Sequence, residues 1–215
     1  MTRAWLVLIL MAGLAVRLWG IGFGLPHVLV RPDELFILGA VIKMHEGNAN
    51  PGFFDYPGLY MYFVAGLYAI FYGVGLVAGW FTDAAHFVKN FSLNWEPYFM
   101  LPRIAGAFLG TATVALVYAT AREYFDRVTA TLGALFIALA FLHVRDSHYA
   151  TTDVPMTFFV MAAMLATLRV DRGRSAQDAW LAGALAGCAA STKYNAVLIV
   201  LPMALVEALH AWNLR

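Results

Sequence analysis

Acidic residues with a chemical use stand at two points of an otherwise apolar chain. Arg31-Pro32-Asp33-Glu34 follows the first apolar segment, and Asp153 stands directly before Val154-Pro155. A carboxylate where the membrane meets water can take a proton from an acceptor hydroxyl as a general base, and nearby cations can hold a departing phosphate. These residue types therefore suit the transfer of a sugar from a lipid-linked phosphate to a hydroxyl group.

Cations that fit the second half of this chemistry occur at three places. Arg103 opens an apolar segment, Arg145 lies eight residues before Asp153, and Lys193 interrupts the apolar stretch near the C-terminus. Each has an ordinary alternative: a lysine between two apolar helices marks a water-facing turn, and Asp153 also fits the N-cap of the next helix. His148, five residues before Asp153, is either within reach of a metal or substrate or a plain loop histidine.

Composition decides where such residues can be placed. The 215 residues are 62% hydrophobic and 13% charged, whereas a soluble domain is about 45–50% apolar and about 25% charged. The chain is therefore predicted to be a membrane protein. Its net charge of +1 gives no case for a nucleic-acid partner. The single cysteine, Cys188, excludes an intrachain disulfide and a cysteine zinc site.

The elements that must position these residues are apolar helices. A spanning helix needs about 20 mostly apolar residues, and the Ala, Leu, Gly and Met content favours helices over a barrel. We predict an all-α fold: a polytopic transmembrane bundle of six or seven membrane helices, with short interfacial helices in the first outer loop. The first segment could also be a signal peptide, but Arg17 interrupts it, either snorkelling or lining a cavity. The segments are Ala4–Gly22, Gly58–Phe81, Leu101–Ala121, Val128–His143, Val154–Val170, Ala176–Ser191 and Tyr194–Trp212.

Short loops rich in arginine are predicted to face the cytoplasm. Two loops qualify, with Arg122 and Arg127 in one and Arg169, Arg172 and Arg174 in the other. Both can be cytoplasmic only if the Tyr- and Gly-rich segment Gly58–Phe81 lies at the outer interface, although a seventh span remains the alternative. A helix over Asp33–His45 is also expected to be interfacial. The outer side then collects Asp33, Glu34, Glu46, Asp55, Asp83, Glu96, Asp146 and Asp153.

Five features in this order resemble the GT-C glycosyltransferases over nearly the whole chain. The most similar branch depends on a phospholipid carrier: family 39, with the lipid A aminoarabinose transferases and protein O-mannosyltransferases. The resemblance implies a first span over 1–22, an outer loop over 23–100 and further spans over 101–212, with the C-terminal part of the family expected to be absent. The features are Pro32-Asp33-Glu34, Phe54-Asp55-Tyr56-Pro57, Arg103, Tyr149-Ala150-Thr151-Thr152-Asp153-Val154-Pro155 and Ser191-Thr192-Lys193-Tyr194-Asn195.

The resemblance also implies roles. Asp33 would be the catalytic base of an inverting transfer from a polyprenyl-phosphate sugar to a lipid, glycan or protein acceptor, at the periplasmic face of a bacterial inner membrane. Glu34 would support the base or bind the acceptor, and Asp153 would shape the site. Asp55 falls where the aminoarabinose transferases place a metal-binding glutamate, so a divalent ion is a candidate cofactor. The substrate- and phosphate-binding set would be Arg103, Arg145, Lys193, Tyr56 and His148. Gly58-Leu59 after Tyr56-Pro57 departs from the relatives that carry a lysine there.

Two other classes of protein are weighed against the transferase. A non-catalytic membrane module would bind a lipid-phosphate carrier or act as a scaffold, with its acids serving as helix caps. A small transporter would need ionisable residues near the midplane of several spans. Apart from Arg17 those are lacking, so the transporter is the weakest of the three.

Overall fold

The computed structural model describes residues 3–172 and 176–213, and within these ranges the chain forms helices and no strand. The predicted all-α fold is confirmed. Three described helices, α3, α5 and α8, are long and apolar enough to cross a membrane, and shorter apolar helices accompany them. The helices are α1 (Arg3–Leu18), η1 (Val28–Val30), α2 (Pro32–Met44), α3 (Leu59–Val77), α4 (Ala84–Leu93), α5 (Trp95–Tyr124), α6 (Arg127–Leu139), α7 (Phe141–Asp146), α8 (Asp153–Asp171), α9 (Ala176–Thr192), η2 (Tyr194–Ile199) and α10 (Val200–Asn213).

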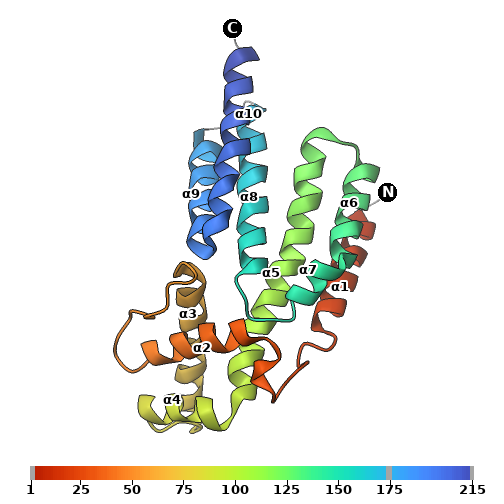
Figure 1. The fold of residues 1–215 in the computed structure, drawn as a ribbon. Helices are drawn as coiled ribbons and strands as arrows, with labels where there is room; N and C mark the ends of the chain where they lie inside the picture. Colours follow the sequence, from red (N-terminus) through yellow and green to blue (C-terminus); the bar gives the residue numbers. More distant parts are fainter. Residues whose placement is uncertain (1–2, 173–175, 214–215) are drawn as a thin grey trace.

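The helices form an upright group and a lower layer (Figure 1). Helices α1 and α6 stand on one side, α8, α9 and α10 on the other, and α2, α3 and α4 lie below. Helix α5 has 30 residues, which at 1.5 Å per residue is about 45 Å. It is therefore long enough to run from the lower layer to the top of the upright group, and it connects the two.

Charged residues divide between the two ends of this arrangement. The α5–α6 turn and the ends of α8 and α9 nearest residues 172–176 lie at the top in Figure 1, and we name this the arginine end after Arg122, Arg127, Arg169 and Arg172. At this end Arg169 donates a 3.4 Å hydrogen bond to Glu123, which joins α8 to α5. Loops 19–31, 45–58 and 147–152, together with the junction between α9 and η2, lie toward the opposite end, which we name the acidic end.

Helix α3 belongs to the lower layer, where it lies below α9 (Figure 1). Aromatic side chains hold this layer together: the Tyr68 hydroxyl donates to the Tyr98 carbonyl at 2.8 Å, and the Tyr98 hydroxyl donates to the Phe87 carbonyl at 2.7 Å. These contacts fasten α3 and α4 to the start of α5. By length and composition α3 is able to cross a membrane, and its assignment to the outer interface stays a prediction.

One predicted span is interrupted. The structure divides Val128–His143 into α6 and α7 at Ala140, whose backbone is not helical. Arg17, fully buried in α1, takes up the carbonyls freed there: it donates to Ala138 at 3.1 Å and Ile137 at 3.3 Å. Because the last turn of a helix leaves its carbonyls without partners, Arg17 serves as a cap for α6.

Three other boundaries differ from the prediction. Helix α5 begins at Trp95 rather than Leu101, with Glu96 and Pro97 in its first turn, where an acid and a proline are both favourable. The segment Tyr194–Trp212 is the 3₁₀ helix η2 followed by α10. Thr152, not Asp153, precedes α8, so the expectation that Asp153 caps this helix is wrong.

Candidate functional site

Two consecutive carboxylates at the start of α2 face different surroundings. Helix α2 begins at Pro32, whose fixed φ suits a first helical position, and residues Asp33 and Glu34 follow in the first turn. Consecutive helical residues point about 100° apart. The Asp33 side chain is 45% exposed, whereas that of Glu34 is 1% exposed. Only Asp33 is therefore accessible to a substrate from solvent.

Glu34 forms a buried ion pair with Arg103 of α5. Arg103 donates from Nε to Glu34 Oε1 at 2.8 Å and from Nη2 to Oε2 at 2.6 Å, a bidentate geometry. Its Nη1 donates to the carbonyls of Ile21 and Phe23 at 2.8 and 3.0 Å. The Ala150 amide donates to Glu34 Oε1 at 2.7 Å. Both charges thus have several protein partners, and together they join α2, α5, the loop after α1 and the loop before α8.

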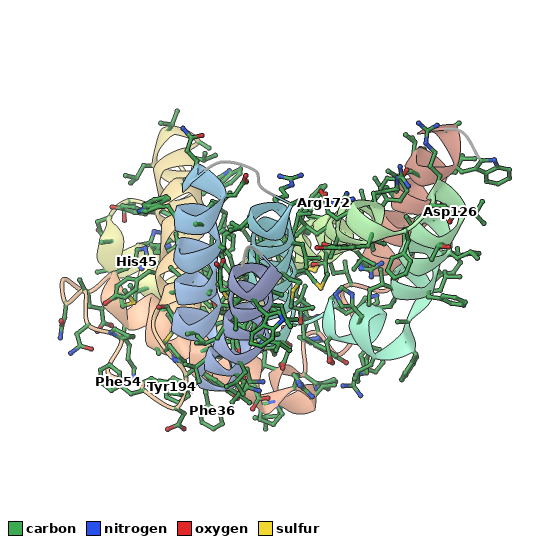
Figure 2. The ribbon with its side chains drawn as sticks, turned by 90° about the horizontal axis from the view of Figure 1, so that it is seen from above. Phe36, His45, Phe54, Asp126, Arg172 and Tyr194 are labelled. Carbon is green, nitrogen blue, oxygen red and sulfur yellow. The ribbon has the colours of Figure 1, made fainter. Side chains whose placement is uncertain are left out.

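Asp153, Lys193 and Tyr56 form a second group at the acidic end. Lys193 lies between α9 and η2 and donates to Asp153 Oδ1 at 2.5 Å. Its ammonium lies 5.9 Å from the centroid of the Tyr56 ring. The Asp153 and Lys193 side chains are 34% and 26% exposed, so both remain accessible. Nearby, the Tyr194 hydroxyl donates to the Phe54 carbonyl at 3.1 Å, and Figure 2 shows these two residues together at one edge.

Tyr56 connects this second group to Asp33. Asp33 and Tyr56 line one cavity of about 270 Å³ with Phe36, Phe53 and Asp55. Burial raises the pKa of the Tyr56 phenol, and the Asp33 carboxylate raises it further while Lys193 opposes the rise. Asp153 and Arg31 act on the same phenol. Tyr56 is therefore a neutral hydrogen-bond donor at physiological pH, surrounded by two carboxylates and two cations.

Two predicted ligands lie on another side of the loop before α8. Arg145 binds Asp146 through Nε at 2.9 Å and Nη2 at 2.7 Å. The ring nitrogens of His148 each lie 2.8 Å from a backbone carbonyl, one of Val144 and one of Trp19. His148 therefore fastens the loop to the end of α1. Arg145 and His148 line a separate, mostly apolar cavity of about 320 Å³, and neither lines the cavity that contains Asp33.

Asp55 is the residue predicted to hold a divalent ion. No group of three or more His, Cys, Asp or Glu side chains able to hold an ion occurs in the part of the chain that the structure describes. Asp55 is exposed and shares its cavity with one other carboxylate, that of Asp33. Because Mg²⁺ is commonly held by one or two carboxylates together with substrate phosphates, a divalent ion at Asp55 stays a prediction, and we derive no step through a metal.

Arg31 is a residue of the site that sequence reasoning did not single out. Its Nε lies 3.7 Å from Asp33 Oδ2, its side chain is 30% exposed, and its guanidinium lies 5.7 Å from the Tyr149 ring centroid. Its position in the sequence could have identified it, because Arg31 stands two residues before Asp33. Its proximity to Tyr56 and Tyr149 depends on segments far along the chain.

The sequence was compared with family models, curated proteins and solved structures. Residues 67–215 match the family model of dolichyl-phosphate-mannose-protein mannosyltransferases. The match includes Arg103, Asp153 and Lys193, and it begins after Asp33 and Tyr56. No curated protein and no solved structure matches the chain. Since the matched range is more than half of a helical membrane protein, the chain belongs to the dolichyl-phosphate-mannose-protein mannosyltransferase family, of GT-C glycosyltransferase type.

Proposed function

We propose that this chain carries out an inverting transfer of a sugar from a polyprenyl-phosphate donor to an acceptor hydroxyl, at the outer face of a bacterial inner membrane. The observation that carries the proposal is the convergence of Asp33, Tyr56, Asp153 and Lys193 at the acidic end. The group contains an accessible carboxylate for proton removal and an accessible cation for phosphate. Family membership supports the donor class.

Asp33 is the general base of this reaction. It accepts the proton of the acceptor hydroxyl while the hydroxyl oxygen bonds to the anomeric carbon. The bond from that carbon to the phosphate oxygen breaks at the same time, and its electron pair leaves on the phosphate. Attack opposite the leaving group inverts the anomeric configuration.

Lys193 stabilises the charge that develops on the phosphate, because a fixed cation is most effective where charge appears in the transition state. Its pairing with Asp153 orients the ammonium and fixes it against the Tyr56 ring. Tyr56 supplies a neutral donor. Glu34 and Arg103 are positioning residues, because they hold the start of α2 and bring no free polar group to the cavity.

Asn in place of Asp33 tests the proposal. Loss of a general base costs about 10²–10⁴-fold in rate, so Asp33→Asn should lower transfer by that factor with an unchanged Kd for the carrier. The assay reconstitutes the full chain in nanodiscs with polyprenyl-phosphate sugars and measures release of polyprenyl phosphate. Glu46→Gln, which neutralises an exposed acid at the other end of α2, is the matched control.

Transfer by Asp33→Asn at the wild-type rate would contradict the assignment of the base. Carrier binding by the wild type without any transfer would contradict catalysis and favour the carrier-binding module. In that case binding would depend on Lys193 and be indifferent to Asp33.

A further inference from the structure

The cations around the proposed site differ in how their donors are used. Arg103 is saturated by Glu34, Arg145 binds Asp146, and Lys193 binds Asp153, each through hydrogen bonds of 2.5–2.9 Å. The guanidinium of Arg31 lies 3.7 Å from its nearest carboxylate, that of Asp33. Within residues 3–172 and 176–213 the Arg31 Nε is buried and has no hydrogen-bond partner. In the described part of the chain, Arg31 therefore differs from the other three cations in making no hydrogen bond to a carboxylate, although Lys193 also keeps donors besides the one it gives to Asp153.

The position of Arg31 suits anion binding. Its guanidinium lies 5.7 Å from the centroid of the Tyr149 ring, which Arg103 also approaches at 5.5 Å. An arginine held against an aromatic ring keeps its planar fork available for bidentate contact with a carboxylate or phosphate. With 30% of its side chain exposed, Arg31 is open to a ligand from outside.

The geometry of an inverting displacement indicates which substrate this ligand belongs to. The base contacts the acceptor hydroxyl, and the leaving phosphate lies on the opposite side of the anomeric carbon. A group bound to a cation 3.7 Å from Asp33 lies beside the base, so it belongs to the acceptor. The carrier phosphate, on the other side of the sugar, is bound by Lys193.

We propose that Arg31 selects an acceptor that carries an oxyanion, either a carboxylate or a phosphate, next to the hydroxyl that Asp33 deprotonates. This inference rests on the proposed function and names the acceptor chemistry of the same site. The acceptor hydroxyl and its oxyanion are held together by Asp33 and Arg31, which are two residues apart at the start of α2. The oxyanion binds the exposed part of the Arg31 side chain, while the buried Nε faces Asp33.

Kinetics with three matched acceptors test the proposal. Pentyl glucoside is neutral, pentyl glucuronide carries a carboxylate, and pentyl glucoside 6-phosphate carries a phosphate. One charge-assisted pair contributes about tenfold or more in affinity. The wild type should therefore show a KM about tenfold lower for at least one anionic acceptor, and the arms with carboxylate and phosphate distinguish the two sources.

Substitution of Arg31 separates selection from a purely structural role. Arg31→Gln should raise KM for the preferred anionic acceptor about tenfold more than it raises KM for the neutral acceptor, and Arg31→Lys should partly restore the preference. Lys43→Gln, which removes an exposed charge from the last turn of the same helix, is the control. An equal fall of kcat for all three acceptors would show that Arg31 only orients Asp33, and would overturn the proposal.

A binding measurement keeps this test independent of catalysis. Equilibrium binding of the three glycosides to nanodisc-reconstituted wild type and Arg31→Gln is followed by tryptophan fluorescence. Preference for an anionic glycoside that is lost in Arg31→Gln supports the oxyanion site even if no transfer occurs, in which case the proposed function alone fails. Equal binding of all three glycosides overturns the oxyanion site.

Discussion

Asp33 and Glu34 are adjacent in the chain, but their environments differ and suit them to different roles. Glu34 accepts three hydrogen bonds in a buried setting, two from Arg103 and one from the Ala150 amide. Asp33 keeps an exposed carboxylate beside Arg31. A charged carboxylate without partners is strongly disfavoured in a protein interior, so the partners of Glu34 are what allow it to be buried. Held in this way, Glu34 fixes the place of its neighbour.

Removing one member of the buried pair should be costly. Arg103→Gln leaves the Glu34 charge without its main partner and is expected to lower the free energy of unfolding by about 3–5 kcal/mol. Glu34→Gln should also destabilise, because it leaves the Arg103 charge buried without its counter-ion. Thermal unfolding in detergent measures both, together with the double variant.

The double variant provides the control for this pair. Because the two charges interact directly, adding the second substitution should cost much less than it does in the wild type. Costs that simply add would mean that the two side chains act independently, contrary to the structure.

Residue types and order singled out Asp33, Asp153 and Lys193, but they also grouped with them Arg145 and His148, which line a separate cavity, and they missed Arg31. Asp33, Asp153 and Lys193 stood out as charges at the ends of apolar segments. The burial of Arg103 against Glu34 depends on a contact between residues 69 positions apart, which no local pattern encodes. The predicted catalytic and binding roles stay predictions.

At the scale of elements, the end of α6 depends on α1. Arg17 reaches the Ile137 and Ala138 carbonyls across 120 and 121 residues. Its guanidinium lies close to α5 because that helix has a glycine, Gly110, at the point of contact. A charged residue in the last turn of one apolar helix thereby becomes the cap of another helix.

Gly110 is accordingly expected to resist substitution. A Cβ at this position would lie 2.5 Å from Ser147 Oγ and 2.9 Å from Arg17 Nε. Overpacking of this kind costs about 1–3 kcal/mol, so Gly110→Ala should lower the unfolding temperature. The measurement is thermal unfolding of the purified chain in detergent.

Gly133 of α6 offers the matched control for this prediction. Its nearest contact for an added Cβ is 3.8 Å away, so Gly133→Ala should be neutral or stabilising through helix propensity. An equal loss of stability in both variants would show that backbone effects, rather than the crowding at Arg17, decide the outcome.

Long apolar runs located the main helices well, because burial in a membrane imposes composition and length together. The interruption at Ala140 could not be foreseen, since the run Val128–His143 has no proline or glycine at that point. Arg17, which binds the carbonyls at this break, is distant in sequence. The early start of α5 was missed because its first turns pack in the lower layer, where apolar length is no guide.

For the whole molecule, the two groups of charges at opposite ends predict which end faces which side of the membrane. In the chain, residue 48 lies in the loop before α3 and residue 84 begins α4, after it; residue 129 is in the first turn of α6, which starts at the arginine end. Labelled residues Asp126 and Arg172 in Figure 2 belong to this arginine end as well. If α3 is interfacial, residues 48 and 84 lie on the same side of the membrane.

Accessibility of introduced cysteines tests this arrangement. In a Cys188→Ser background, Asn48→Cys and Ala84→Cys should react with an impermeant maleimide from the outside. Thr129→Cys should react only in inverted vesicles. All three positions have exposed side chains. Labelling of Ala84→Cys from the side opposite to Asn48→Cys would establish α3 as a seventh span instead.

The Glu34–Arg103 pair has a consequence for biogenesis. Glu34 leaves the ribosome 69 residues ahead of Arg103, and the Ala150 amide that completes its partners follows 116 residues after Glu34. Until α5 has been inserted, the Glu34 carboxylate lacks its cation and must stay hydrated. The start of α2 can therefore close onto the bundle only after α5 has entered the membrane. Because of this order of translation, the region around Asp33 stays exposed to water until α5 and the loop before α8 are in place.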